Sequence, residues 1–320
     1  MKHSTKITVL LIMMFIVTQL IGIFIISIYN TPGNSLPFGM QPPEEIQPSN
    51  IPFSILIAFV IAIGLFFVLT KINAEKFIRF WFFMVTALAL GLSFKALLIF
   101  FKTPDYSFFG IPFLYPEISL LSIIVFIVGL TIAFFKIYKR NLIVHNFSEL
   151  LIYPGIAAVF IPLLNEIGII ILLFVISLYD IWAVWKSQFM QKMAKYQIEH
   201  LKFFTGFFIP YANKKDKQKI KTIKTKYKNK SEKFLISKLK KEKVKVNLAI
   251  LGGGDVIFPI ITAGIFYKIY NPYAALIITA SATIALLALF MFAKKGKFYP
   301  AMPFITIGLY IGMMINWLIF

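Results

Sequence analysis

Long apolar runs constrain this chain more than any other feature of its sequence. A helix needs about 20 residues to cross the hydrocarbon core of a bilayer. Runs of that kind recur along the whole sequence, so we predict an all-α polytopic membrane protein with nine transmembrane helices in one membrane domain, residues 1–320. The predicted spans are residues 7–29, 52–70, 78–101, 117–137, 142–164, 166–185, 247–267, 273–293 and 301–320.

The composition indicates that lipid, rather than water, surrounds much of the chain. Hydrophobic residues make up 59% and charged residues 14%, against about 45–50% and about 25% in soluble domains. The formal charge of +20 would suggest nucleic acid in a soluble protein, but in a membrane protein it is typical of basic cytoplasmic loops, and we expect no nucleic-acid partner. The sequence has no cysteine, which excludes disulfides, thiolate metal sites and cysteine nucleophiles.

Basic residues fall on alternate connections between the predicted spans. Lysine and arginine gather on the cytoplasmic side of membrane proteins, so we expect a cytoplasmic N-terminus, an outside C-terminus and a location in the cell membrane. The residues on the basic connections are Lys2, Lys6, Lys71, Lys76, Arg79, Lys136, Lys139, Arg140, Lys294, Lys295 and Lys297, with many lysines in 186–246, whereas the other connections hold only Lys102 and Lys268.

One long connection, residues 186–246, divides the first six spans (1–185) from the last three (247–320). Apolar residues at helical spacing in 190–210 predict a helix in the membrane interface. They are Met190, Met193, Ala194, Leu201, Phe204 and Phe208.

The second half of this connection, residues 213–245, is rich in lysine and has few apolar residues. We expect a mobile or disordered loop that is attracted to anionic membrane lipid. Its end alternates with a period of two over Lys243–Val246, which is typical of a short strand.

Two aspartates lie within predicted spans, where carboxylates are costly and are functional candidates by default. Asp180 precedes Lys186 by six residues, or roughly 9 Å along a helix. Asp255 follows Lys245 by ten residues, or roughly 15 Å if that stretch is helical. Both are therefore expected on the cytoplasmic side at similar depth, as a shared site requires.

A pair of adjacent carboxylates suits two kinds of function. Such a pair can share one proton, so that one group activates a water molecule as a general base and the other acts as a general acid. The expected reaction is direct attack of water on a peptide bond, with no covalent intermediate and no cofactor. Paired aspartates in a membrane also suit a transporter or leak channel for protons or cations.

Three glycines, Gly252, Gly253 and Gly254, directly precede Asp255. They weaken a helix and remove side chains, which leaves room for an extended substrate beside the carboxylate. Close packing between helices explains such glycines equally well.

Prolines open the last predicted span in the segment Pro300-Ala301-Met302-Pro303. They remove backbone donors, and the freed carbonyls can meet water or a substrate strand only if they line a cavity. Taken alone, this segment is better explained as an ordinary helix start.

Together these segments resemble the presenilin and signal peptide peptidase family of intramembrane aspartyl proteases. The family's tyrosine–aspartate motif is Tyr179-Asp180, its glycine-x-glycine-aspartate motif is Gly252–Asp255, and its proline–alanine–leucine motif is Pro300-Ala301-Met302, with methionine in place of leucine. The order of the motifs, the spans that carry them, the span count and the long loop between the aspartates all fit the family, so the resemblance covers the whole chain.

The resemblance implies that Asp180 and Asp255 are the catalytic pair. It also implies that Tyr179, the glycines and Pro300–Met302 shape the substrate-binding site. The expected substrates are single membrane-spanning helices with their N-termini outside, cut without obligatory partner subunits; oligomerisation stays open. The strand at Lys243–Val246 is then expected to pair with the unwound substrate.

Two other protease classes do not fit. Ser93 and His145 could suggest a Ser–His dyad, but Ser93 lies roughly 21 Å above Arg79 and His145 roughly 7 Å above Arg140, so their depths differ. The three histidines are scattered and no H-E-x-x-H is present, as a zinc protease would need. His145 and Glu149 are spaced to face one another on a helix, and we interpret them as a structural pair.

Overall fold

The computed structural model describes most of the chain, with gaps in several connections. The described residues are 5–32, 34, 51–72, 74–101, 120–139, 141–186, 193, 196–201, 204–212, 214–227, 246–293 and 299–320.

A long helix forms in each of the nine predicted segments. Such helices form because the segments are apolar and because lipid offers their backbone groups no other hydrogen-bond partners. Seven segments within the described ranges, those of α1, α3, α4, α5, α6, α11 and α12, are long and apolar enough to cross a membrane. The helices are α1 (Thr5–Tyr29), α2 (Ile51–Lys71), α3 (Glu75–Phe100), α4 (Leu120–Phe134), α5 (Leu142–Phe160), α6 (Glu166–Ile181), α10 (Gly253–Ile269), α11 (Pro272–Phe292) and α12 (Met302–Ile319).

Short irregular turns extend three of these helices. The π-helical segments η2 (Phe135–Lys139) and η4 (Trp182–Lys186) follow α4 and α6, and the 3-10 turn η3 (Ile161–Leu163) follows α5. The break between α5 and α6 is made by Asn165, whose side chain accepts a hydrogen bond from the Gly168 N–H at 2.7 Å. This is N-capping, which allows a new helix to begin after a two-residue interruption.

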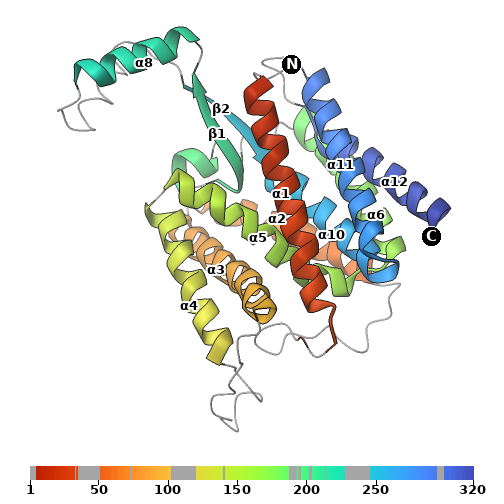
Figure 1. The fold of residues 1–320 in the computed structure, drawn as a ribbon. Coiled ribbons are helices and arrows are strands. Elements are labelled where there is room, and N and C mark those ends of the chain that lie inside the picture. The colour runs from red at the N-terminus through yellow and green to blue at the C-terminus, as the bar shows by residue number, and fades with distance from the viewer. Residues whose placement is uncertain are drawn as a thin grey trace.

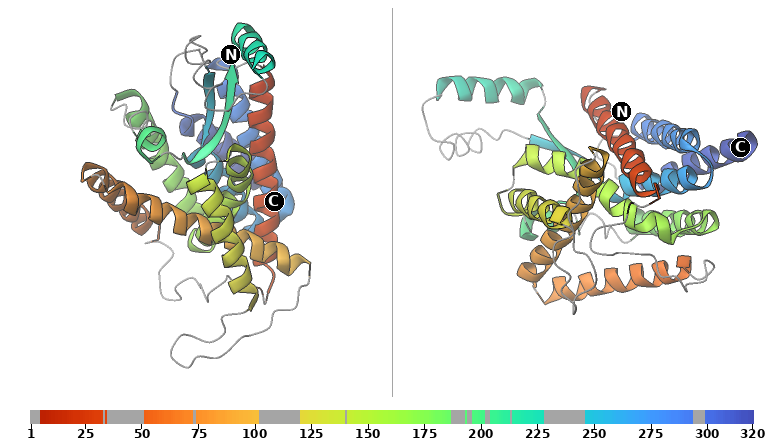
Figure 2. Two further views of the ribbon diagram at one scale, coloured as in Figure 1. Left: turned by 90° about the vertical axis from the view of Figure 1, so that its left-hand side faces the viewer. Right: turned by 60° about the horizontal axis from the view of Figure 1, so that its bottom comes forward.

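Helix α10 lies at the centre of the bundle (Figures 1 and 2). It contacts α1, α5, α6, α11 and α12, and the apolar residues that it buries belong to the largest core cluster. At one end of the bundle the carboxylate of Glu166, the first residue of α6, accepts hydrogen bonds from Tyr270 at 3.3 Å and from Trp317. These bonds join α6 to the C-terminal ends of α10 and α12.

The expectation of an all-α fold is wrong in one respect, because two strands form an antiparallel pair. Strand β1 (Gly206–Ala212) pairs with β2 (Val246–Gly252), in a register that sets Gly206 opposite Gly252. In β2 the side chains alternate: Ala249 and Leu251 are buried, and Leu248 and Ile250 are exposed. This period of two is the strand pattern, and it overrides the apolar content that predicted a helix from residue 247.

The expected interfacial helix over 190–210 is wrong for residues 204–210. Helical turns occur at Met193, at Tyr196 and in the π-helical segment η5 (Gln197–Leu201), but Phe204 lies outside any helix and Phe208 lies in β1. Aromatic and β-branched residues in Phe207-Phe208-Ile209 favour a strand. Met190 and Ala194 lie outside the described residues.

Part of the Lys-rich segment forms helix α8 (Lys214–Lys226), so the expectation of a disordered loop is wrong for these residues. Ile223 is buried, and α8 contacts β1, which gives the helix an apolar anchor. Figure 1 shows α8 standing away from the bundle at the end of the β1–β2 pair. Residues 228–245, including most of the strand predicted at Lys243–Val246, lie outside the described part; Val246 begins β2.

Candidate active site

Asp180 lies near the C-terminal end of α6, where its side chain is buried. Its Oδ2 accepts a hydrogen bond from the backbone N–H of Met302 at 3.0 Å. A buried carboxylate needs such a partner, because taking its charge out of water without one is costly. The last turn of α6 is thus joined to the start of α12.

The Pro300–Pro303 segment provides this partner. Ala301 is the N-cap of α12 and Met302 its first residue, so the Met302 N–H belongs to the donors that a helix start leaves without intrahelical partners. Pro303 has no N–H and removes another of these donors. The positive end of the helix dipole also favours a negative charge at this place. Pro300 is buried, and Ala301 is half-buried.

Asp255 lies in the first turn of α10, directly after β2, and is half-buried. A Cβ atom placed on Gly252 would lie 3.1 Å from Oδ2 of Asp255, so the carboxylate turns back toward the strand end. The following carbonyl, that of Val256, accepts a hydrogen bond from the buried Gln19 of α1 at 2.9 Å. Because Pro259 lacks an N–H, the Asp255 carbonyl has no helical donor four residues ahead.

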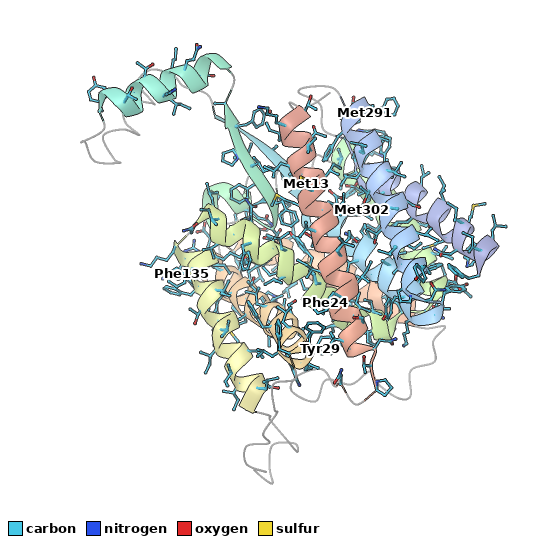
Figure 3. The ribbon with its side chains drawn as sticks, viewed as in Figure 1. Met13, Phe24, Tyr29, Phe135, Met291 and Met302 are labelled. Atoms are coloured by element: carbon cyan, nitrogen blue, oxygen red, sulfur yellow. The ribbon has the colours of Figure 1, made fainter. Side chains whose placement is uncertain are left out.

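The structure places the two aspartates on helices that contact one another. The depth that the sequence predicted for Asp255 is nevertheless wrong. The residues between Lys245 and Gly253 form a strand, which rises about 3.3 Å per residue, so the depth of about 15 Å based on a helix is wrong. Helices α6 and α10, which carry Asp180 and Asp255, contact one another. In Figure 3, Met302 lies at about the height of Met13 on α1 and away from Tyr29, which ends that helix.

The three glycines lie at a junction between strand and helix rather than within a helix. Gly252 ends β2, and Gly253 begins α10. A Cβ atom on Gly253 would lie 2.9 Å from Cε1 of Tyr153 on α5, a distance that real side chains do not tolerate. Gly254 is exposed. Close packing against Tyr153 therefore explains why residue 253 is a glycine. It does not explain the glycine at position 254.

The remaining residue of the motif, Tyr179, is half-buried on α6 next to Asp180. Its ring lies 6.2 Å from the ring of Trp182, at an angle of 39°. The two aromatic side chains therefore lie together at the end of α6 that carries Asp180.

The predicted separation of Ser93 from His145 agrees with the contacts of both side chains. Ser93 Oγ donates to the carbonyl of Leu151 at 2.6 Å, while His145 Nε2 contacts the carbonyl of Gly206 at 2.9 Å. Within the described ranges, no group of three or more His, Cys, Asp or Glu side chains is arranged to hold a metal ion.

Sequence reasoning missed several polar residues beside β1 and at the start of α10. Lys136, counted among the loop lysines, is buried and forms an ion pair with Glu149 at 2.7 Å. Asn146 and Gln19 bond to the backbone of β1 and α10. Only the spacing of His145 and Glu149 pointed to this cluster, because the partners come from elements far apart in the sequence.

Comparisons with known proteins identify the class that this geometry suggests. The family model described as "Signal-peptide peptidase, presenilin aspartyl protease" matches residues 11–320. The chain therefore belongs to the signal peptide peptidase and presenilin family of aspartyl proteases, and it is a multi-pass membrane protein.

Solved structures show the same fold. The chain is similar to two crystal forms of a presenilin family intramembrane aspartate protease. In space group C222 the identity is 15% and the TM-score 0.59, with 98% of this chain and 99% of that chain covered. In space group P2 the identity is 18% and the TM-score 0.57, with 97% of each chain covered. No curated protein matches the sequence.

Proposed function

We propose that the protein is an intramembrane aspartic endopeptidase in which Asp180 and Asp255 form the catalytic pair. The observation that carries this proposal is that the contacting helices α6 and α10 each carry an aspartate, in a chain that belongs to an aspartyl protease family. Asp180, in the last turn of α6, accepts a hydrogen bond from the start of α12, and Asp255 lies in the first turn of α10.

The proposed reaction is hydrolysis by activated water. One aspartate, in its carboxylate form, removes a proton from water, which attacks the peptide carbonyl carbon. The other aspartate, in its protonated form, donates a proton to the carbonyl oxygen and the pair then protonates the leaving amine. The C–N bond breaks to give a carboxylic acid and an amine, and no covalent intermediate forms.

The proposed substrate is a membrane-spanning helix that unwinds beside β2. Phe208 directs both its N–H and its carbonyl away from β2, toward Asn146. In an antiparallel pair, the partner of such a residue also directs its backbone groups outward, and that partner is Ile250. The outer edge of β2 can therefore accept an extended peptide, close to Asp255 and along the small Gly252–Gly254 segment.

The other motif residues have supporting roles in this proposal. Met302 holds Asp180 through its N–H, Pro300 and Ala301 shape the backbone that presents this donor, and Tyr179 borders the substrate beside Asp180. The apolar helices and alternating loop charges support nine spans in the cell membrane, a cytoplasmic N-terminus and an outside C-terminus. Substrates would then be single spans with their N-termini outside, cut without partner subunits.

Helix α8 supports a further contact with membrane lipid. Seven of its residues are lysines and one is an aspartate, and it stands at the end of the β1–β2 pair (Figure 1). Clusters of basic residues near a membrane surface are attracted to anionic headgroups. We include anionic lipid among the proposed partners.

The deciding experiment measures cleavage of a single-span model substrate, with its N-terminus outside, in proteoliposomes. The native chain is compared with Asp180→Asn and Asp255→Asn, and with Asp216→Asn on α8 as a matched control. We expect product from the native chain and the control, and none from the other two variants.

Two outcomes would contradict the proposal. Equal cleavage by Asp255→Asn and the native chain would exclude this aspartate from catalysis. Absence of product from the folded native chain, together with proton or cation flux that Asp255→Asn abolishes, would instead favour a transporter or channel.

A further inference from the structure

We infer that four polar residues beside β1 act as a clamp that positions Asp255 and closes the outer edge of β1 to substrates. The α5 clamp consists of Lys136 in η2 and His145, Asn146 and Glu149 in α5. This inference rests on the proposed function, since it concerns where a substrate strand can pair and how Asp255 is held.

Asn146 occupies the outer edge of β1 as a neighbouring strand would. Its Nδ2 donates to the carbonyl of Phe208 at 3.0 Å, and its Oδ1 accepts from the Phe208 N–H at 3.2 Å. One side-chain amide thus satisfies both outward backbone groups of that residue. A substrate strand cannot form these two bonds while Asn146 holds them.

Gly206 is held in the same way by two other side chains of the clamp. The Gly206 carbonyl accepts from His145 Nε2 at 2.9 Å, which assigns the ring proton to Nε2 because a carbonyl can only accept. The Gly206 N–H points at Oε1 of Glu149 at 3.5 Å. Gly206 has a φ of +145°, and a Cβ atom there would lie 2.6 Å from the Leu251 carbonyl oxygen, so only glycine fits this position.

Lys136 allows Glu149 to serve as a buried acceptor. The two side chains are 3% and 1% exposed and lie 2.7 Å apart. A buried carboxylate without a cationic partner is strongly destabilising. The ion pair therefore keeps a charged acceptor beneath β1 at the end of the strand nearest the aspartates.

The next outward position on β1 is Pro210, which has no N–H to offer. Proline at such a place is a known means of blocking a sheet edge. The three outward positions nearest Gly252, namely Gly206, Phe208 and Pro210, are thus closed by the clamp or by proline. The outer edge of β2 is then the edge that a substrate strand can use.

The register connects the clamp to catalysis. Gly206 pairs with Gly252, and Gly252 leads through the first turn of α10 to Asp255. A shift of β1 against α5 therefore shifts β2, and with it the Asp255 carboxylate and the peptide bond that β2 presents. The four clamp residues are positioning residues, because three of them contact β1 and Lys136 holds Glu149.

The test compares Asn146→Ala with Asn271→Ala. Asn271 caps α11 by accepting a hydrogen bond from the Ala274 N–H at 2.9 Å, so its loss removes an asparagine side chain and a hydrogen bond to the backbone outside the site.

For Asn146→Ala we expect faster hydrogen exchange over β1 and β2. We also expect new cleavage positions in the product mass spectrum and a fall in kcat of about tenfold or more, since small misplacements are costly. Asn146→Asp keeps the acceptor for the Phe208 N–H but sets a second carboxylate oxygen against the Phe208 carbonyl, so it should loosen the strands as Asn146→Ala does.

The two arms of the test separate this inference from the proposed function. Unchanged exchange over β1 and β2 in Asn146→Ala, or exchange that changes while kcat and cleavage positions match those of Asn271→Ala, would overturn the inference. If the native chain cleaves nothing, the proposed function fails first, and the exchange measurement still decides whether Asn146 holds the strands.

Discussion

Met302 donates its backbone N–H to Oδ2 of Asp180 at 3.0 Å, across 122 positions of the sequence. The bond connects two of the three motifs and explains why prolines flank Met302. They end the preceding segment and start α12 where the free N–H meets the carboxylate. The role of this motif in the structure is thus a backbone role, and the methionine in place of leucine leaves the donor unchanged.

This bond predicts a difference between two inactive variants. Asp180→Asn keeps an oxygen that accepts from Met302, whereas Asp180→Leu leaves the buried N–H without a partner, at a cost of about 1–3 kcal/mol. Both variants should be inactive, but only Asp180→Leu should lose stability to that extent, as thermal unfolding in detergent would show. Equal stability of the two would contradict a structural role for the bond.

Met302→Leu tests the same relationship from the other side. It keeps the backbone donor and nearly the same side-chain volume, and swaps of this kind cost less than about 1.5 kcal/mol. We expect activity within a few-fold of the native chain, with cleavage positions as the more sensitive measure. A loss as large as that of Asp180→Asn would show that the side chain, rather than the N–H, is essential.

The contact between Gly253 and Tyr153 predicts that Gly253→Ala impairs the protein. The added methyl group would meet the Tyr153 ring at 2.9 Å, and overpacking costs about 1–3 kcal/mol. We expect reduced stability and cleavage, partly restored by the second change Tyr153→Leu. Gly64→Ala is the control, because nothing lies within 4 Å of its Cβ position, and it should behave as the native chain does.

The buried ion pair predicts non-additive effects on the free energy of unfolding. Lys136→Met leaves Glu149 buried and unpaired, a situation that costs about 3–5 kcal/mol. The double change Lys136→Met with Glu149→Leu should be less destabilising than Lys136→Met alone. A double-mutant cycle by unfolding in detergent measures this coupling, and strictly additive changes would argue that the pair is not formed.

The lysines of α8 predict a dependence of cleavage on anionic lipid. Lys219 and Lys221 are exposed, and each basic residue near an anionic surface contributes about 1 kcal/mol. Replacing both with glutamine should reduce the ratio of activity in anionic to activity in zwitterionic proteoliposomes. Thr222→Gln, also exposed, should leave that ratio unchanged, and an unchanged ratio in both variants would argue against lipid contact.

Much of the fold could be predicted because apolar length is a local property. Counting consecutive apolar residues is enough to recognise the segments that form α1, α3 and α11. The cap at Asn165 likewise depends only on the residues that directly follow it. The same reasoning failed for β2, since Val246–Gly252 is apolar in composition but alternates in burial. That alternation depends on a partner, β1, which lies more than thirty residues earlier in the sequence.

The sequence by itself determined the apolar helices, the loop charges and the three motifs that mark the family. These depend on neighbouring residues and on the cost of placing polar groups in lipid. Only the tertiary structure decided that Met302 bonds to Asp180, that Gly253 packs on Tyr153, and that Lys136 and Glu149 lie beneath β1. Each of these contacts joins elements distant in sequence, and a buried polar group takes whichever partner the packed helices bring within hydrogen-bond distance.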